Sequence, residues 1–419
     1  MDIRAGTVAD TAALFDFYRA QLIDDCVPFW LRNSLDQQYG GYLTFLRRDG
    51  TPYGYNKYVW PQAREAYLFS KLYNDLDKRD EWLHASRLGV EFLRKFAFID
   101  DVRTHFKLAR NGVPLSDRPH EIFAESFVVI ALAEYARAAQ REEFLDSALR
   151  LFWGIVSRLE NGELERKSLV VQPVYREHAP TMILINTAQG LRDIQNNARL
   201  NELIEKWVTD ELTIYSPDNH QAMFERVASN GLVDLTEPEG RSITPGHCME
   251  SSWFCMTEGA RLGRQDTIAK AATIIEWTIR HGWDEEFGGL FNYVDFRRDP
   301  PGHHDENWGE DQDWDAKLDW VHSEALYALL LAFDLTGKEL FFEWYRKLHE
   351  WAFSHFPDPQ FGEWYGYLRR DGTISQTLKG GMKGFFHVPR ALLNCLLLLD
   401  KRQKRLKGAR GEETCHSSL

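Results

Sequence analysis

Two short stretches of this sequence place a histidine beside a charged side chain. In PGHCMESSW, His247 stands three residues before Glu250. In HVPRALL, His387 stands three residues before Arg390. Residues three apart on a helix share one face, so both members of a pair can reach the same space. Histidine changes its protonation near neutral pH, and these residue types at this spacing therefore indicate general acid–base chemistry.

Other helix openings carry residues of the same kinds. The stretch KYVWPQAR contains Lys57 and Arg64, and KLDWVHSEA contains Asp319, Trp320 and Glu324. A single polar residue on a helix is usually solvated, but here such residues recur at the start of alternate helices. We therefore expect these opening turns to converge on one site.

Helical periodicity dominates the chain and sets where these openings fall. The apolar residues predict twelve helices, at about 8–33, 57–76, 79–97, 121–138, 142–160, 179–197, 200–213, 246–263, 266–281, 318–335, 339–356 and 386–402. No glycine fingerprint follows a strand, which argues against a dinucleotide-binding sheet. The partial positive charge of helix N-termini would favour an anionic intermediate and a neutral histidine.

One short pattern occurs three times, beginning at Asp36, Asp284 and Asp358. Each copy follows a long helix and has a glycine turn, an alternation of aromatic and polar residues, and then Arg-Arg-Asp. The alternation predicts a short hairpin strand, and the repetition predicts a fold of helical hairpins. We predict an all-α fold, an (α/α)6 barrel of six helical hairpins with short β-hairpins in its loops. Residues 1–400 would form this single catalytic domain, with alternate helices lining its inside.

Charge and composition exclude several classes of protein. The 419 residues include 50 Lys and Arg against 63 Asp and Glu, a net charge of -13, so neither nucleic acid nor an anionic membrane is an expected partner. No apolar run is long enough to span a membrane. Five scattered cysteines without a CxxC pair are typical of a reducing compartment, and we expect a cytoplasmic protein. The basic segment 401–419 is expected to be a flexible tail.

Rival chemistries have weaker support in the sequence. The HxxE of His247 and Glu250 lacks the second histidine of a zinc HExxH motif, and adjacent residues such as His303 and His304 rarely ligate one ion together, so we expect no metal. No GxSxG nucleophile motif is present. Glu125 and Glu324 would be candidates for the paired carboxylates of an inverting glycoside hydrolase.

The motifs resemble the N-acylglucosamine 2-epimerase family, which is also known through renin-binding protein. The resemblance is carried by KYVWPQAR, IFAESF, PGHCMESSW, HGWDEEFGGLF, KLDWVHSEA, FGEWYGYL and KGGMKGFFHVPRALL, in order, and runs from about residue 25 to about residue 400. It implies an (α/α)6 barrel that epimerises sugars at C2. It also implies a homodimer that needs no redox cofactor, with activation by a nucleotide left open.

The resemblance places functional roles on particular residues. It puts the two catalytic histidines on His247 and His387. Sugar-binding residues fall on Arg64, Glu250, Glu324 and Arg390, and we expect these six side chains to line one cavity. Trp253, Trp320, Asp319 and Lys57 are added as substrate-binding candidates because they begin the same helices.

Two departures from the family pattern bear on the substrate. Asp319 stands where the family often has tryptophan, and Val321 where it has proline. Ile183 stands where relatives that act on cellobiose or isomerise mannose carry a histidine. The sequence therefore leaves open N-acetyl-D-glucosamine/N-acetyl-D-mannosamine against D-glucose/D-mannose. An aldose–ketose isomerase, a glycoside hydrolase and a protein that only binds are the alternatives.

Overall fold

The computed structural model describes residues 7–115, 122–162, 175–298, 314–375 and 383–416. Six helices lie on the inside of a ring: α3 (Val59–Asp75), α5 (Ile122–Ala139), α7 (Ala179–Ile194), α9 (Pro245–Leu262), α11 (Asp319–Thr336) and α13 (His387–His416). The outer helices are α1 (Val8–Ala20), α4 (Asp80–Phe96), α6 (Glu142–Glu160), α8 (Ala198–Thr213), α10 (Gln265–Gly282) and α12 (Glu339–His355). A π-helical turn, Gln21–Cys26, joins α1 to α2 (Val27–Asn33).

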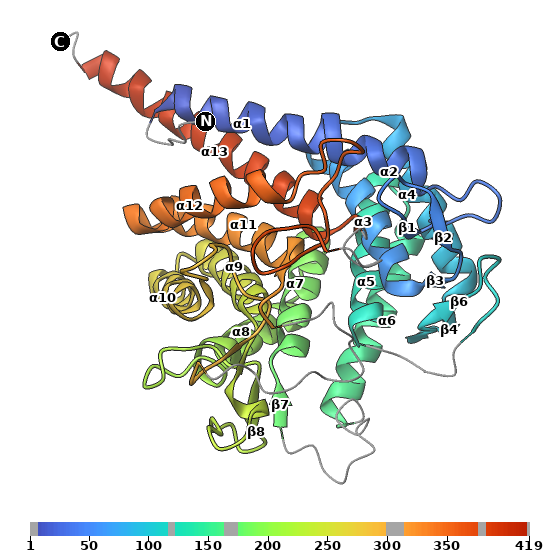
Figure 1. Cartoon of the computed structure of the whole chain (residues 1–419). Helices are drawn as coiled ribbons and strands as arrows, with labels where there is room; N and C mark the ends of the chain where they lie inside the picture. The colour runs from blue at the N-terminus through green and yellow to red at the C-terminus, as the bar shows by residue number, and fades with distance from the viewer. Residues whose placement is uncertain (1–6, 116–121, 163–174, 299–313, 376–382, 417–419) are drawn as a thin grey trace.

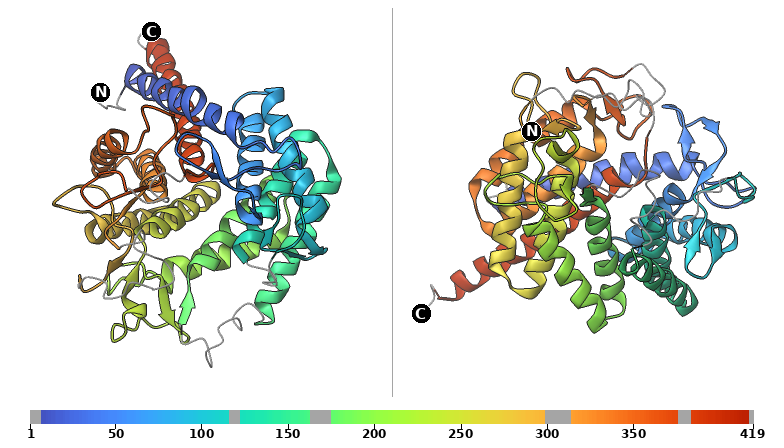
Figure 2. Two further views of the ribbon diagram at one scale, coloured as in Figure 1. Left: turned by 45° about the vertical axis from the view of Figure 1, so that its right-hand side comes forward. Right: turned by 90° about the horizontal axis from the view of Figure 1, so that it is seen from below.

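Neighbouring inner helices pack against each other around a closed ring. α3 contacts α5, the contacts continue through α7, α9 and α11 to α13, and α13 returns to α3. Each outer helix packs on an inner one, with α4 on α3 and α1 on α13, so the first and last helices lie side by side (Figures 1 and 2). The predicted (α/α)6 barrel is confirmed.

Burial explains which helices lie inside. In α11 almost every residue from Val321 to Phe333 is buried, as expected for a helix covered by neighbours on all sides. The outer helix α4 buries one face, including Trp82 and Leu93, and exposes charged residues on the other. The alternation of these two helix types along the chain builds the two layers.

Short antiparallel ladders connect the helices. The pairs are β1 (Phe45–Leu46) with β2 (Pro52–Gly54), β3 (Lys57–Tyr58) with β6 (Lys107–Leu108), β4 (Phe98–Asp100) with β5 (Arg103–Thr104), β7 (Tyr175–Glu177) with β8 (Arg226–Ala228), β9 (Ser242–Ile243) with β10 (Val294–Asp295), and β11 (Lys317–Leu318) with β12 (Tyr367–Leu368). The ladders β1–β2 and β4–β5 are hairpins of the predicted kind, whereas the others pair strands from different loops. Several of these strands end directly at an inner helix, so the ladders fix where the helix N-termini begin.

Lys57 belongs to the structural turns and not to the cavity. Its fully buried ammonium donates to Asp36 Oδ2 at 2.9 Å and to the carbonyl oxygen of Gly40. The other two copies of the repeated turn hold the pairs Lys317–Asp284 and Lys383–Asp358. Lys57, predicted to bind substrate, does not line the cavity, because this ion pair holds its ammonium inside the turn.

The C-terminal segment continues the last inner helix. The sequence predicts a flexible tail from Lys401, and α13 runs on into this segment and extends past the other helices (Figure 1). Arg402 and Arg405 both pair with the buried carboxylate of Asp334 on α11, which holds the first turns of the segment against the barrel. Among the described residues, no helix is long and apolar enough to cross a membrane.

Candidate active site

The opening turns of all six inner helices line one cavity of about 380 Å³, within the usual size range for small-molecule sites. Its wall includes Trp60 and Arg64 from α3, Phe123 and Phe127 from α5, Met182 and Ile183 from α7, His247 and Glu250 from α9, Asp319 and Trp320 from α11, and His387 from α13. The predicted convergence of the inner helix N-termini is therefore found in the structure.

Both candidate catalytic histidines face this cavity and lie against one tryptophan. The His247 ring centroid is 5.3 Å from that of Trp320, and the His387 centroid is 5.5 Å from it. The two histidines come from α9 and α13, which flank α11 in the ring. A flat molecule placed beside Trp320 would have imidazoles from two different helices within reach.

His387 is held by a carboxylate beneath the cavity wall. Its Nδ1 lies 2.9 Å from Glu324 Oε1, and Trp253 Nε1 donates to Glu324 Oε2 at 2.9 Å. Burial, and then the positive charge of Arg64, lower the pKa of His387 well below its usual value. A neutral ring that donates Nδ1–H to Glu324 leaves the lone pair of Nε2 to accept a proton.

Arg390 links two buried carboxylates, Glu250 on α9 and Glu324 on α11. It donates to Glu324 Oε1 at 2.6 Å and to Glu250 Oε1, and these carboxylates raise its pKa although burial opposes the shift. Arg390, Glu324 and Trp253 are nearly fully buried and lie behind the residues that line the cavity. The sequence predicted that these three bind substrate directly, whereas the structure has them support His387 and Glu250.

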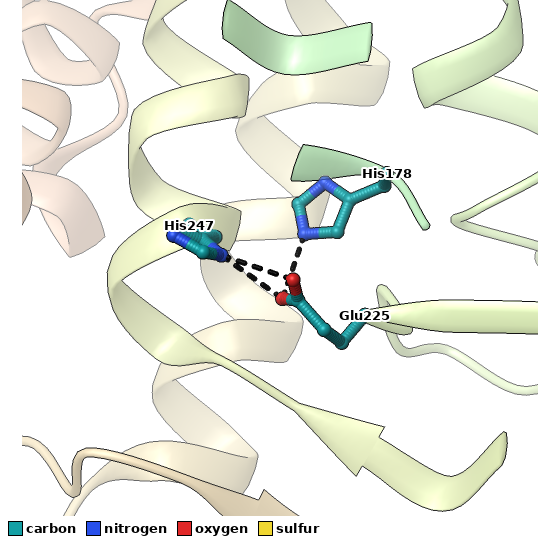
Figure 3. Close-up of side chains that lie close together, drawn as sticks. All are labelled: His178, Glu225 and His247. Atoms are coloured by element: carbon teal, nitrogen blue, oxygen red, sulfur yellow. Dashed lines mark hydrogen bonds and ion pairs between the residues drawn. The ribbon is translucent and has the colours of Figure 1, made fainter. Parts of the chain in front are cut away.

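His247 is held by a second carboxylate, which the sequence did not identify. Its Nδ1 lies 3.0 Å from Glu225 Oε2, and the same oxygen lies 3.1 Å from Nε2 of the buried His178 (Figure 3). His178 is the N-cap residue of α7. The search for polar residues at the start of inner helices would have identified His178 if it had included this helix. Glu225 lies on no helix and had no signal in the periodicity.

Two polar groups of the wall lack hydrogen-bond partners within the described residues. Arg64 Nε and Thr44 Oγ1 are both buried and unpaired. The guanidinium of Arg64 instead stacks over Trp60, Phe127 and Phe386, with its carbon 4.1–4.7 Å from the ring centroids. Burial lowers the pKa of Arg64 to about 9, which keeps it a cation at neutral pH. A polar ligand would satisfy both groups.

Asp319 also reaches the cavity, beside Trp320. Its Oδ1 accepts a hydrogen bond from the Trp320 amide at 2.6 Å. Burial raises the pKa of this carboxyl well above its usual value. A carboxyl group in either protonation state can form a hydrogen bond with a hydroxyl group of a ligand.

Carboxylates and histidines in this region also include ligand types that metals prefer. The sets His178, Glu225, His247 and Glu250, Glu324, His387 each bring such atoms within 4.8 Å of one another. Hydrogen bonds within each set and to Arg390 hold these atoms in place. His303 and His304 lie outside the described residues.

The predicted carboxylate pair of a hydrolase is not formed at the cavity. Glu125 is fully buried, and its Oε2 accepts from Arg158 at 2.5 Å. Glu324 is occupied by His387 and Arg390. Neither carboxylate lines the cavity, so they are not placed to flank a glycosidic bond from two sides.

Comparison with known proteins identifies the class. Residues 40–391 match the N-acylglucosamine 2-epimerase (GlcNAc 2-epimerase) family. The chain is 33% identical to the N-acylglucosamine 2-epimerase of Bos taurus over 93% of this chain and 92% of that protein. It is 32% identical to the human N-acylglucosamine 2-epimerase, over 90% and 88%.

A solved structure shows the same fold. The cellobiose 2-epimerase of Spirochaeta thermophila superposes with a TM-score of 0.77 over 94% of this chain and 98% of that one, at 21% identity. The fold, the histidine site and these relatives together define a sugar 2-epimerase, which is an isomerase. This chain belongs to the N-acylglucosamine 2-epimerase family.

Proposed function

We propose that this protein inverts C2 of a reducing aldohexose by removing and returning the C2 proton. The observation that carries the proposal is the placement of His247 and His387 against Trp320. The same cavity is lined by Arg64, whose buried Nε has no hydrogen-bond partner among the described residues. Each histidine has its Nδ1 on a carboxylate, so each has its Nε2 free for proton transfer.

The chemistry follows from the open-chain form of the sugar. The C1 aldehyde acidifies the hydrogen on C2, and one histidine removes it as a proton. The electron pair of the broken C–H bond moves into an enediolate, or into its acylamino analogue. The second histidine, protonated, delivers a proton to the opposite face of C2, and the configuration is inverted. The roles of the histidines exchange in the reverse reaction.

Arg64 would stabilise the negative charge of the intermediate. Its guanidinium is a cation packed among apolar rings, where an interaction with an oxyanion is stronger than in water. Glu250 would accept hydrogen bonds from sugar hydroxyls at the same wall. The reaction moves only protons and so needs no redox cofactor. Whether a nucleotide activates the enzyme is a separate question for assay.

Two features of the wall support two substrates. Met182, Ile183 and Phe127 form an apolar surface on the α5 and α7 side, which suits the methyl group of an N-acetyl sugar. This surface and the named relatives favour N-acetyl-D-glucosamine/N-acetyl-D-mannosamine. Asp319 supports the second candidate, D-glucose/D-mannose, because a carboxyl can bind a hydroxyl where the family often has an indole.

The product distinguishes epimerisation from its closest alternative. Aldose–ketose isomerisation passes through the same enediolate but returns the proton to C1. The test is proton NMR of the purified protein in D2O with each sugar pair in turn. We expect deuterium at C2 of both epimers and no ketose. A ketose product would identify an isomerase, and no exchange with any of these sugars would contradict the proposal.

We also propose that the protein is a cytoplasmic homodimer. The family resemblance supports a homodimer, which size-exclusion chromatography with light scattering would measure. Four cysteines, Cys26, Cys248, Cys255 and Cys395, are free and buried, which fits a reducing compartment such as the cytoplasm.

A further inference from the structure

A row of side chains runs from the cavity into the buried wall of the barrel. It begins at His247 on α9 and continues through Glu225 and His178 to Glu211 on α8. Figure 3 shows the first three, with Glu225 between the two imidazole rings. The mechanism proposed above uses His247 and the carboxylate of Glu225 that holds it, so His178 and Glu211 need a separate explanation.

His178 has a carboxylate at each ring nitrogen. Its Nδ1 lies 3.2 Å from Glu211 Oε2, and its Nε2 lies 3.1 Å from Glu225 Oε2. A neutral imidazole carries one N–H and can donate to only one of these oxygens. When both carboxylates are ionised, both contacts are attractive only if the ring carries two N–H groups, that is, if it is an imidazolium.

The fold fixes this arrangement through the backbone. β7 ends at Glu177 and β8 begins at Arg226, and these two residues face each other in the ladder. His178 and Glu225 are the next residues outward, and the His178 amide donates to the Glu225 carbonyl at 3.1 Å. On the far side, Ser251 Oγ donates to Glu211 Oε2 at 2.7 Å.

The electrostatics agree with the geometry. Burial opposes a charge on His178, but Glu225 and Glu211 outweigh it and raise its pKa to about 10. Burial also opposes ionisation of Glu225, yet the two neighbouring histidines lower its pKa well below the usual value. The titratable groups that face His178 are Glu211, Tyr215, Glu225 and His247.

We propose that His178 is a positioning residue, a permanent imidazolium that fixes Glu225 so that Glu225 orients His247 for proton transfer. This inference rests on the proposed function, because it takes His247 as one of the two acid–base groups. His387 is held differently, by Glu324 with an arginine behind it. In each case a buried cation fixes the carboxylate that holds the histidine.

The first test replaces the cation by a neutral side chain of similar size, His178→Gln. A shift of the Glu225 carboxylate by about 1 Å misplaces His247, and we expect kcat to fall by about 10–10². The ring centroids of His178 and His247 are 5.7 Å apart, so loss of the charge should move the acidic limb of the kcat/KM profile upward by about 0.5–2 pH units. On a Glu225→Gln background the same change should lower kcat little further.

His322 supplies a matched control. It is also fully buried near the start of an inner helix, but among the described residues its ring bonds only to the backbone of Leu318 and Leu290. His322→Gln should lower the melting temperature without moving the pH profile. If His178→Gln behaves like His322→Gln, with lower stability and unchanged kcat and pH profile, His178 is structural and the inference is overturned.

A measurement on the unmodified protein covers the case in which His178→Gln does not fold. In 15N-histidine-labelled protein, we expect one ring with both nitrogens protonated to persist at pH 8.5. Absence of such an imidazolium overturns the inference even if C2 exchange is observed. Absence of C2 exchange with a persistent imidazolium would instead contradict the proposed function alone.

Discussion

Removing either histidine of the cavity separately tests the two-base mechanism most directly. Both His247→Ala and His387→Ala should fold, because the carboxylates they release keep other partners. Glu225 retains His178, and Glu324 retains Arg390 and Trp253. The side chains are 26% and 17% exposed, so truncation opens space to the cavity and leaves no sealed void.

The expected loss follows from the role of each group. One positioned acid–base group contributes about 10²–10⁴ in rate, or about 3–5 kcal/mol of barrier. Epimerisation needs a proton removed on one face and returned on the other. Each variant should therefore lose net turnover by at least this factor, while its melting temperature stays close to that of the unchanged protein.

Exchange of the C2 hydrogen separates the two groups. The remaining histidine can still remove and return a proton on its own face. Each variant should therefore incorporate deuterium from D2O into one epimer only, and the two variants should select opposite epimers. NMR of each purified epimer with each variant measures this. Epimerisation by either variant near the original rate would refute the two-base mechanism and make that histidine structural.

Three further predictions concern single positions. Asp319→Trp should shift the ratio of kcat/KM values toward the N-acyl sugar by up to about 1–3 kcal/mol, measured with both sugar pairs; an unchanged ratio would show that Asp319 does not select the substrate. Arg64→Met keeps the packing and removes the cation, and should lower kcat by about 10²–10³ if Arg64 stabilises the oxyanion. Asp284→Ala leaves the buried Lys317 unpaired and should lower the free energy of unfolding by about 3–5 kcal/mol in urea, whereas the exposed Glu286→Ala should change it by less than about 1. Burial opposes ionisation of Asp284, but Arg370 and Lys317 outweigh it and lower the pKa of this carboxyl to about 2. Its contribution to the free energy of unfolding is therefore present above about pH 4 and is lost as the pH falls through about 2. In the Asp284→Ala variant this loss of stability at low pH should be missing.

The sequence by itself determined the helices. The predicted helix at 142–160 is found as Glu142–Glu160, and the one at 246–263 as Pro245–Leu262. The spacing of apolar residues along each helix shows which of its faces is buried, so the helices could be predicted from the local sequence alone. The same record placed His247 and His387 at helix openings, and the recurrence of such openings predicted the shared cavity.

Only the tertiary structure decided how those side chains are supported. Lys57 lies in β3, directly before the inner helix α3 that carries Arg64. A turn aspartate, Asp36, nevertheless holds the Lys57 ammonium away from the cavity. Glu225 lies directly before β8, and the pairing of β8 with β7 sets its position. It contacts His178, which is 47 residues earlier in the sequence. Helical periodicity records burial along one element, but it carries no information about which charged groups from distant loops meet. The residues that fix the charge and orientation of the two histidines could therefore be identified only from the tertiary structure.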